Sequence, residues 1–210
     1  MSSEPDSSRP DREPGIGRLI SLSDAVVAIS LTLLVLQLHV PDQLRNPNSA
    51  SELATQLGKG GGQLVSYVIS FYVIAQFWGV HRRIFRRASD EESVLEWWNF
   101  AFLFTITVMP FTSDLLGAYT QNPLAVDIFA VNLLLASLST QAMAVVGRRK
   151  GVLISGPGAR EGAVRTAVVP VVMALSIALS WWSTSAATYS WILIAVAPPV
   201  VDRLLATRKA

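Results

Sequence analysis

An apolar run near the start of the chain, Arg18 to Pro41, constrains the fold more than any other feature. It reads RLISLSDAVVAISLTLLVLQLHVP, and its strongly polar groups are confined to the first turns and the last turn. A helix needs about 20 apolar residues to cross a hydrocarbon core of roughly 30 Å. The run therefore predicts a membrane-spanning helix.

This predicted helix has two different sides. On a helical wheel Ile29, Leu33 and Leu36 fall on one stripe, with Thr32 beside it. Asp24 lies about 140° away from that stripe on the same wheel. The stripe is apolar, whereas the other side carries a carboxylate near the start of the helix.

Five more apolar segments follow, so we expect an all-α polytopic membrane protein with six transmembrane helices. The six segments lie near 19–40, 63–81, 96–117, 124–146, 164–182 and 188–206. With 51% hydrophobic and 15% charged residues, the chain is too apolar for an ordinary soluble domain. We expect a disordered tail over 1–17, a six-helix membrane domain over 18–206 and a short end at 207–210.

Smaller features complete the expected layout. The loop after the first segment contains Ser51 to Leu57, which predicts a short amphipathic helix that ends at Gly58. The aromatic side chains Trp181, Trp182, Tyr189 and Trp191 fit an interfacial belt. The chain has no cysteine, which excludes disulfides and cysteine metal sites.

The basic residues predict the orientation in the membrane. Fifteen of the 17 lysine and arginine residues fall on one side of the six-span arrangement, and only Arg45 and Lys59 fall on the other. The positive-inside rule then places both termini in the cytoplasm. The net charge of only +2 argues against a nucleic-acid partner.

The same topology brings polar side chains together in one leaflet: Arg18, Ser23, Asp24, His81 and Asn99. A carboxylate inside the bilayer needs donors, and the arginine, histidine and asparagine side chains can supply them. We interpret the group as a structural polar network. An Asp24–His81 pair acting on Ser23 is a possible catalytic alternative, but no oxyanion device or substrate pocket is visible.

The first helix also resembles that of a known family. Arg18, the residues Leu22-Ser23-Asp24-Ala25 and the run Thr32-Leu33-Leu34-Val35-Leu36 are similar to the signature of the endolysosomal potassium channel family (transmembrane protein 175) in its bacterial form. The family usually has Phe where this chain has Leu22. The signature occurs once, and one-repeat bacterial members of the family work as tetramers, so the resemblance implies a homotetramer.

The resemblance also implies a function and its residues. Four first helices would surround a potassium-permeable pore, with Ile29, Leu33 and Leu36 as its constriction and Thr32 as a selectivity layer. A Trp-x-x-His of the family, matched here by Trp78 and His81, would link to the motif on the first helix. The chain has no carbonyl-type filter sequence. The expected partners are potassium ions and membrane lipids, with no cofactor, no metal site and no enzymatic activity, in the inner membrane of a bacterium.

Several alternatives stay open at this stage. The stripe on the first helix could serve ordinary packing or lipid contact. A proton- or cation-coupled secondary transporter would use Asp24 and His81 as its ion site, and a membrane enzyme would use the same pair. Asp114 and Asp127 could form an outer carboxylate ring, although solvated helix ends are the simpler interpretation.

Overall fold

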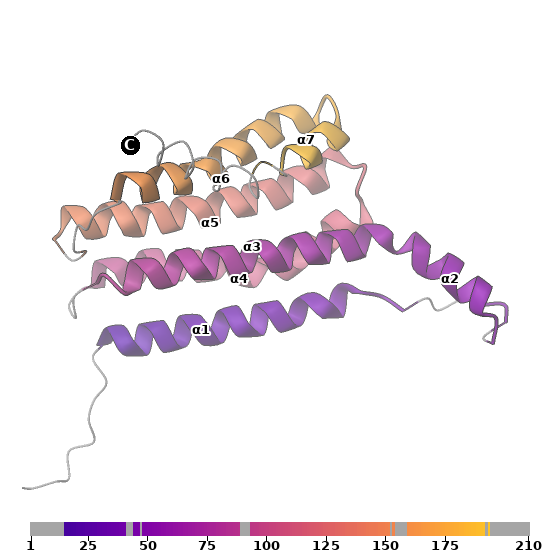
Figure 1. Ribbon diagram of the computed structural model, residues 1–210, viewed down its shortest axis with the longest axis horizontal. Helices are drawn as coiled ribbons and strands as arrows, with labels where there is room; N and C mark the ends of the chain where they lie inside the picture. Colours follow the sequence, from indigo (N-terminus) through magenta and orange to yellow (C-terminus); the bar gives the residue numbers. More distant parts are fainter. Residues whose placement is uncertain are drawn as a thin grey trace, which may run out of the picture.

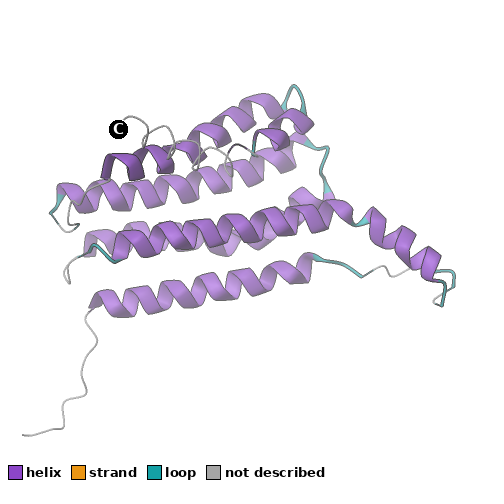
Figure 2. Cartoon of the chain, in the orientation of Figure 1, coloured by secondary structure: helices purple, strands orange, loops and turns teal. Residues whose placement is uncertain are grey.

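The chain forms an antiparallel bundle of long helices in a computed structural model that describes residues 15–40, 44–46, 48–88, 93–151, 153, 159–191 and 193. Figure 2 shows helices joined by loops throughout this part of the chain, which confirms the all-α prediction. The elements are α1 (Gly15–Leu33), the 3₁₀ turn η1 (Leu34–Gln37), α2 (Ala50–Lys59), α3 (Gly61–Phe85), α4 (Ser93–Ala118), α5 (Pro123–Arg149), α6 (Ala159–Ser180) and α7 (Thr184–Ser190).

The helices are stacked in layers, with α1 on one side, α3 and α4 in the middle, and α5, α6 and α7 beyond them (Figure 1). Helix α4 contacts α1, α3 and α5 and is the centre of the bundle. Its side chains Phe102, Ile106 and Met109 are fully buried. Leu34 of η1 and Phe129 of α5 are equally buried and close the core from either side.

Four described helical segments are long and apolar enough to cross a membrane, namely Gly15–Gln37, Gly61–Phe85, Leu95–Ala118 and Pro123–Arg149. They coincide with the first four predicted segments. The fifth prediction, 164–182, falls on α6, whose described apolar part Val168–Ser180 is shorter. Most of the sixth, 188–206, lies outside the described residues, so the count of six spans stays a prediction.

Two predicted boundaries differ from the structure. Helix α1 begins at Gly15, so residues 15–17 are helical rather than part of the tail, and residues 1–14 lie outside the described residues. The outer-loop helix α2 starts one residue before Ser51 and continues past Gly58 to Lys59. Its N-terminus is capped by Ser49, whose hydroxyl accepts a hydrogen bond from the backbone N–H of Glu52.

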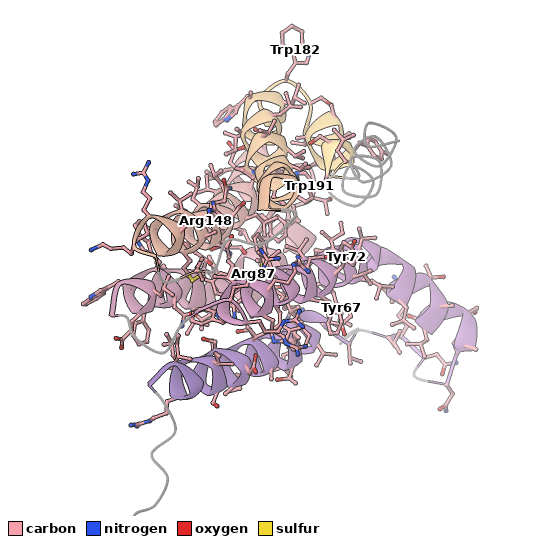
Figure 3. All side chains as sticks on the ribbon, turned by 60° about the vertical axis from the view of Figure 1, so that its left-hand side comes forward. Tyr67, Tyr72, Arg87, Arg148, Trp182 and Trp191 are labelled. Atoms are coloured by element: carbon pink, nitrogen blue, oxygen red, sulfur yellow. The ribbon has the colours of Figure 1, made fainter. Side chains whose placement is uncertain are left out.

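The aromatic belt prediction is wrong for one of its four residues. Trp181, Trp182 and Tyr189 are exposed, and Figure 3 shows Trp182 projecting away from the bundle. Trp191 is instead only 6% exposed, its ring centroid lies 5.1 Å from that of Phe129, and its indole N–H donates to Ser176. It is a core residue, and its burial is tolerated because its N–H has a buried partner.

Helices α3 and α4 approach one another closely where α3 begins and α4 ends. A Cβ atom added to Gly117 would lie 2.6 Å from the Ser66 hydroxyl and 2.9 Å from the Cα of Gln63. A Cβ on Gly62 would lie 2.9 Å from the Gly117 carbonyl oxygen. One turn further in, the Ser70 hydroxyl donates to that of Ser113 at 2.8 Å. Small residues therefore let the two backbones touch, as in many membrane helix pairs.

Candidate functional site

The side of α1 and η1 that contacts α3 and α4, which we call the inner face, holds the first helix against the bundle. Its buried residues recur at helical spacing and are Ser23, Val27, Ser30, Leu34 and Gln37. The Gln37 side-chain amide donates to the Pro110 carbonyl oxygen inside α4. Contacts with α3 and α4 along this face determine how the helix is rotated about its axis.

The outer face of the same segment carries the four residues predicted to line a pore. Ile29, Leu33 and Leu36 are 58%, 43% and 71% exposed, and Thr32 is exposed beside them. The Thr32 hydroxyl donates to the Ile29 carbonyl oxygen at 2.8 Å. Its proton is therefore occupied within the helix, and the lone pairs of its oxygen stay free to accept or to coordinate a cation.

Three of the predicted network residues form a cluster at the inner end of the bundle, which we call the Ser23–Asn99–His81 cluster. The Asn99 amide donates to the Ser23 hydroxyl at 2.9 Å, and the Asn99 carbonyl oxygen lies 2.7 Å from Nε2 of His81. The Ser23 hydroxyl also reaches the Leu19 carbonyl oxygen. All three cluster side chains are fully buried, so α1, α3 and α4 are joined by hydrogen bonds away from solvent.

The imidazole of His81 is enclosed by aromatic rings. It stacks on Phe102 with a centroid separation of 5.3 Å and an interplanar angle of 17°, and Phe85 lies 4.5 Å away. Its second nitrogen, Nδ1, is buried and has no hydrogen-bond partner among the described residues. Among the residues that the structure describes, Asn99 is therefore the only hydrogen-bond partner of this ring.

Asp24 is bound by one of the two residues that the resemblance links to the first-helix motif. Its carboxylate accepts a hydrogen bond from the indole N–H of Trp78 at 2.8 Å, whereas the donors expected from topology, Arg18, His81 and Asn99, do not bind it. The Arg82 guanidinium carbon lies 4.6 Å from the centre of the Trp78 ring. A positive charge thus lies over the ring whose N–H binds the carboxylate. Arg18 is exposed and belongs to neither group.

The outer carboxylates are also not simple solvated helix ends. Asp127, in the first turns of α5, accepts hydrogen bonds from the Ser180 hydroxyl at 2.6 Å and from the Trp181 indole at 2.7 Å. It links α5 to the end of α6. Oδ1 of Asp114 is buried without a partner among the described residues. Sequence reasoning missed the Asp127 contacts because the donors lie more than 50 residues away in the chain.

The region that holds both the outer face and the polar cluster is the one that known proteins share. The sequence model of the family described as the endosomal/lysosomal potassium channel TMEM175 matches residues 18–110. A potassium channel of Streptomyces collinus is 26% identical over 175 residues, which cover 80% of this chain and 83% of that one. Over residues 18–110 the chain is thus similar to the TMEM175 family.

Other relatives are matched over a smaller part of this chain, and the human one is much longer. A potassium channel of a Chryseobacterium species is 28% identical over 125 residues, 59% of this chain and 60% of that protein. The human endosomal/lysosomal proton channel TMEM175 is 28% identical over 132 residues, which are 25% of its length. The chain thus spans three-fifths of the first relative and a quarter of the human one.

Solved structures share the fold of this chain. A lysosomal potassium-selective channel TMEM175 homolog from Chamaesiphon minutus superposes with a TM-score of 0.74 at 23% identity, covering 88% of this chain and 96% of that one. The potassium channel MtTMEM175, crystallised as a variant with a Nanobody-MBP fusion protein, gives a TM-score of 0.62 at 16% identity. At these identities the likeness establishes the fold.

Proposed function

We propose that the chain is the subunit of a homotetrameric, potassium-permeable cation channel whose pore is lined by the outer face of α1. Relatives that are similar over 80% and 59% of the chain are named potassium channels. The proposed constriction consists of Ile29, Leu33 and Leu36, with Thr32 as a hydroxyl layer. Rings of apolar side chains can block hydrated ions by dewetting, and a ring of hydroxyl oxygens can replace part of an ion's water shell.

The observation that carries this proposal is the contrast within one helix. The outer face bears exposed Ile29, Leu33 and Leu36, while residues on the opposite side are buried against α3 and α4. The bundle leaves this outer face unused. It is therefore available to surround an axis shared by four copies, with the Thr32 oxygen facing the same way.

A structural role for the polar network follows from its burial. His81 and Asn99 are fully buried and bond to one another, so an ion or substrate has no open path to them from the described surface. Asp24 is bound to Trp78. We propose that the Ser23–Asn99–His81 cluster and the Asp24–Trp78 pair hold α1 in its rotation, which supports a channel over a transporter with a mobile ion site at Asp24 and His81.

The charge pattern supports an inner-membrane location with the Arg-rich ends in the cytoplasm. The last turns of α3 and α5 contain Arg82, Arg83, Arg148 and Arg149, and both helices end on the side where α1 begins (Figure 1). The positive-inside rule assigns that side to the cytoplasm. Both chain termini are proposed to lie there.

The proposal is tested by bilayer recording of the purified chain with different potassium and sodium concentrations on the two sides. We expect a linear current that needs no proton gradient and a reversal potential displaced toward that of potassium. Saturable flux driven by a proton gradient would support the transporter instead.

A matched pair of variants tests the pore assignment. Ile29→Asn should wet the constriction and raise the current several-fold. Val68→Asn on α3 makes the same chemical change at a similarly exposed position, 55% against 58%, and should leave the current unchanged. Equal currents in both variants and the parent would mean that the outer face of α1 does not line the pore.

A further inference from the structure

Helix α2 carries an apolar face that the described residues of the subunit do not cover. Ala50, Leu53, Ala54 and Leu57 recur at the spacing of one helix face. All four are exposed, with Leu53 at 37% and Leu57 at 56%. Among the described helices α2 contacts only α3, and none of its ten residues is buried.

The segment that ends in α2 is nevertheless well braced. The Glu52 carboxylate accepts hydrogen bonds from the backbone N–H groups of Arg45 at 2.7 Å and Asn46 at 3.0 Å. These donors lower the pKa of Glu52. Together with the Ser49 cap they join the chain before the helix to its first turn, so the apolar face is presented by an ordered unit.

Lipid does not explain this apolar face. Counted from Arg82 at the cytoplasmic end of α3, a hydrocarbon core of roughly 30 Å ends about 20 residues earlier, near Gly62. Helix α2 ends before that point, at Lys59, and leads away from the bundle in Figure 1. Its apolar face therefore lies beyond the hydrocarbon core.

The direction of α2 indicates what covers it. In both Figure 1 and Figure 3 the helix slants from the end of α3 toward the level of α1. It leans to the side on which the outer face of α1 lies open. If that outer face surrounds a fourfold axis, the four copies of α2 converge beyond the outer ends of the pore helices.

We propose that α2 docks through Ala50, Leu53, Ala54 and Leu57 on the α2 helices of neighbouring copies, forming a collar beyond the outer mouth. This inference rests on the proposed tetrameric channel. Two leucines and two alanines are too small an interface to assemble free subunits. In a tetramer already held together by its spans, the docking is intramolecular in effect, and a small apolar contact suffices. The opposite side of α2, with Glu52 and Lys59, stays in water.

Disulfide cross-linking tests the collar directly, because the chain has no cysteine of its own. Leu57→Cys in the full chain, oxidised in native membranes, should give a dimer band on a non-reducing gel, since each subunit has one thiol and can form one disulfide. The control is Thr55→Cys, about 160° away on the same helix and also exposed, which should cross-link several-fold less. Light scattering of the purified variants measures the assembly state in parallel.

The outcomes separate the two proposals. A tetramer with cross-links at position 57 and few at position 55 supports the collar. A tetramer in which the two positions cross-link equally or not at all overturns the collar and leaves the channel proposal intact. A monomer by light scattering overturns both. A bimane label at position 57 that is strongly quenched by spin-labelled lipids overturns the collar in favour of membrane contact.

Discussion

The two faces of α1 differ in the polarity and the burial of their side chains. The inner face buries Ser23 and Ser30, and at its outer end Gln37 donates to a carbonyl of α4. The outer face exposes Ile29 and Leu36, which are apolar. A helix of a soluble protein has the opposite arrangement, with its polar residues facing out.

The difference shows how the rotation of α1 about its own axis can be fixed against α3 and α4 without a hydrophobic driving force. Apolar side chains gain little by leaving lipid for another helix, so hydrogen bonds and close packing must select the rotation. Ser23, bonded to Asn99, does so at the inner end, and Gln37, bonded to Pro110, does so at the outer end. The outer face is left free for its proposed role in lining a pore.

The largest expected effect separates two leucines that lie two residues apart. Leu34→Ala should lower the free energy of unfolding by about 2–5 kcal/mol, because Leu34 is fully buried and its truncation leaves a cavity. Leu36→Ala should change it little, since Leu36 is 71% exposed. Thermal unfolding of the detergent-purified variants measures both. Equal losses would remove the distinction between the faces.

A second, smaller loss is expected at the Ser23–Asn99–His81 cluster. Asn99→Ala removes the hydrogen-bond partner that the described structure gives the buried His81 ring, and it should destabilise the fold by about 1–3 kcal/mol. The control, Thr107→Ala, lies on the same helix but is exposed and bonds only within it. Unfolding midpoints that fall together in both variants would argue against a specific role for the cluster.

The third effect should appear in selectivity and not in stability. Thr32→Ala removes a hydroxyl oxygen from the outer face and should lower the preference for potassium over sodium several-fold, read from reversal potentials. Thr32→Ser keeps the oxygen and should retain the preference. Loss of selectivity in both variants, or in neither, would separate Thr32 from the permeation path.

The smallest effect concerns Glu52, which neither face of α1 touches. Backbone donors hold its pKa below the ordinary value of 4.5, so the hydrogen bonds it accepts are present above that pH and are lost as pH falls through the lowered pKa. The amide proton resonances of Arg45 and Asn46, followed by NMR in detergent, should titrate with that lowered midpoint. A midpoint at or above 4.5 would contradict the structure.

Much of the helix layout could be predicted from the sequence because apolar length is a direct requirement of the bilayer. The predicted span 63–81 falls within Gly61–Phe85, and 124–146 within Pro123–Arg149. Helix ends were less predictable, since a chain can continue as a helix into the headgroup region. Gly15 extends α1 beyond the predicted limit for this reason.

The contacts within the candidate site depend on rotation about each helix axis, which topology does not give. Topology places Ser23, His81 and Asn99 in one leaflet, and the structure brings them within hydrogen-bonding distance. Topology alone does not pair Asp24 with Trp78; the resemblance linked Trp78 and His81 to the first-helix motif, and the structure shows that Trp78 binds Asp24. Trp78 and His81 are three residues apart on α3, yet they reach different partners because α1 and α4 approach that face from different sides.

In the 3₁₀ turn at the end of α1, a change between 3₁₀ and α-helical geometry alters the length of the segment and the direction of its side chains together. With three residues per turn and about 2.0 Å of rise per residue, the turn stacks Leu36 above Leu33 and is about 2 Å longer than four α-helical residues. Returning Leu34–Gln37 to an α-helix would shorten the segment and swing Leu36 sideways by about 60°. At this end of the helix, rotation and axial length are therefore linked. The hydrogen bond from Gln37 to the Pro110 carbonyl oxygen opposes both changes.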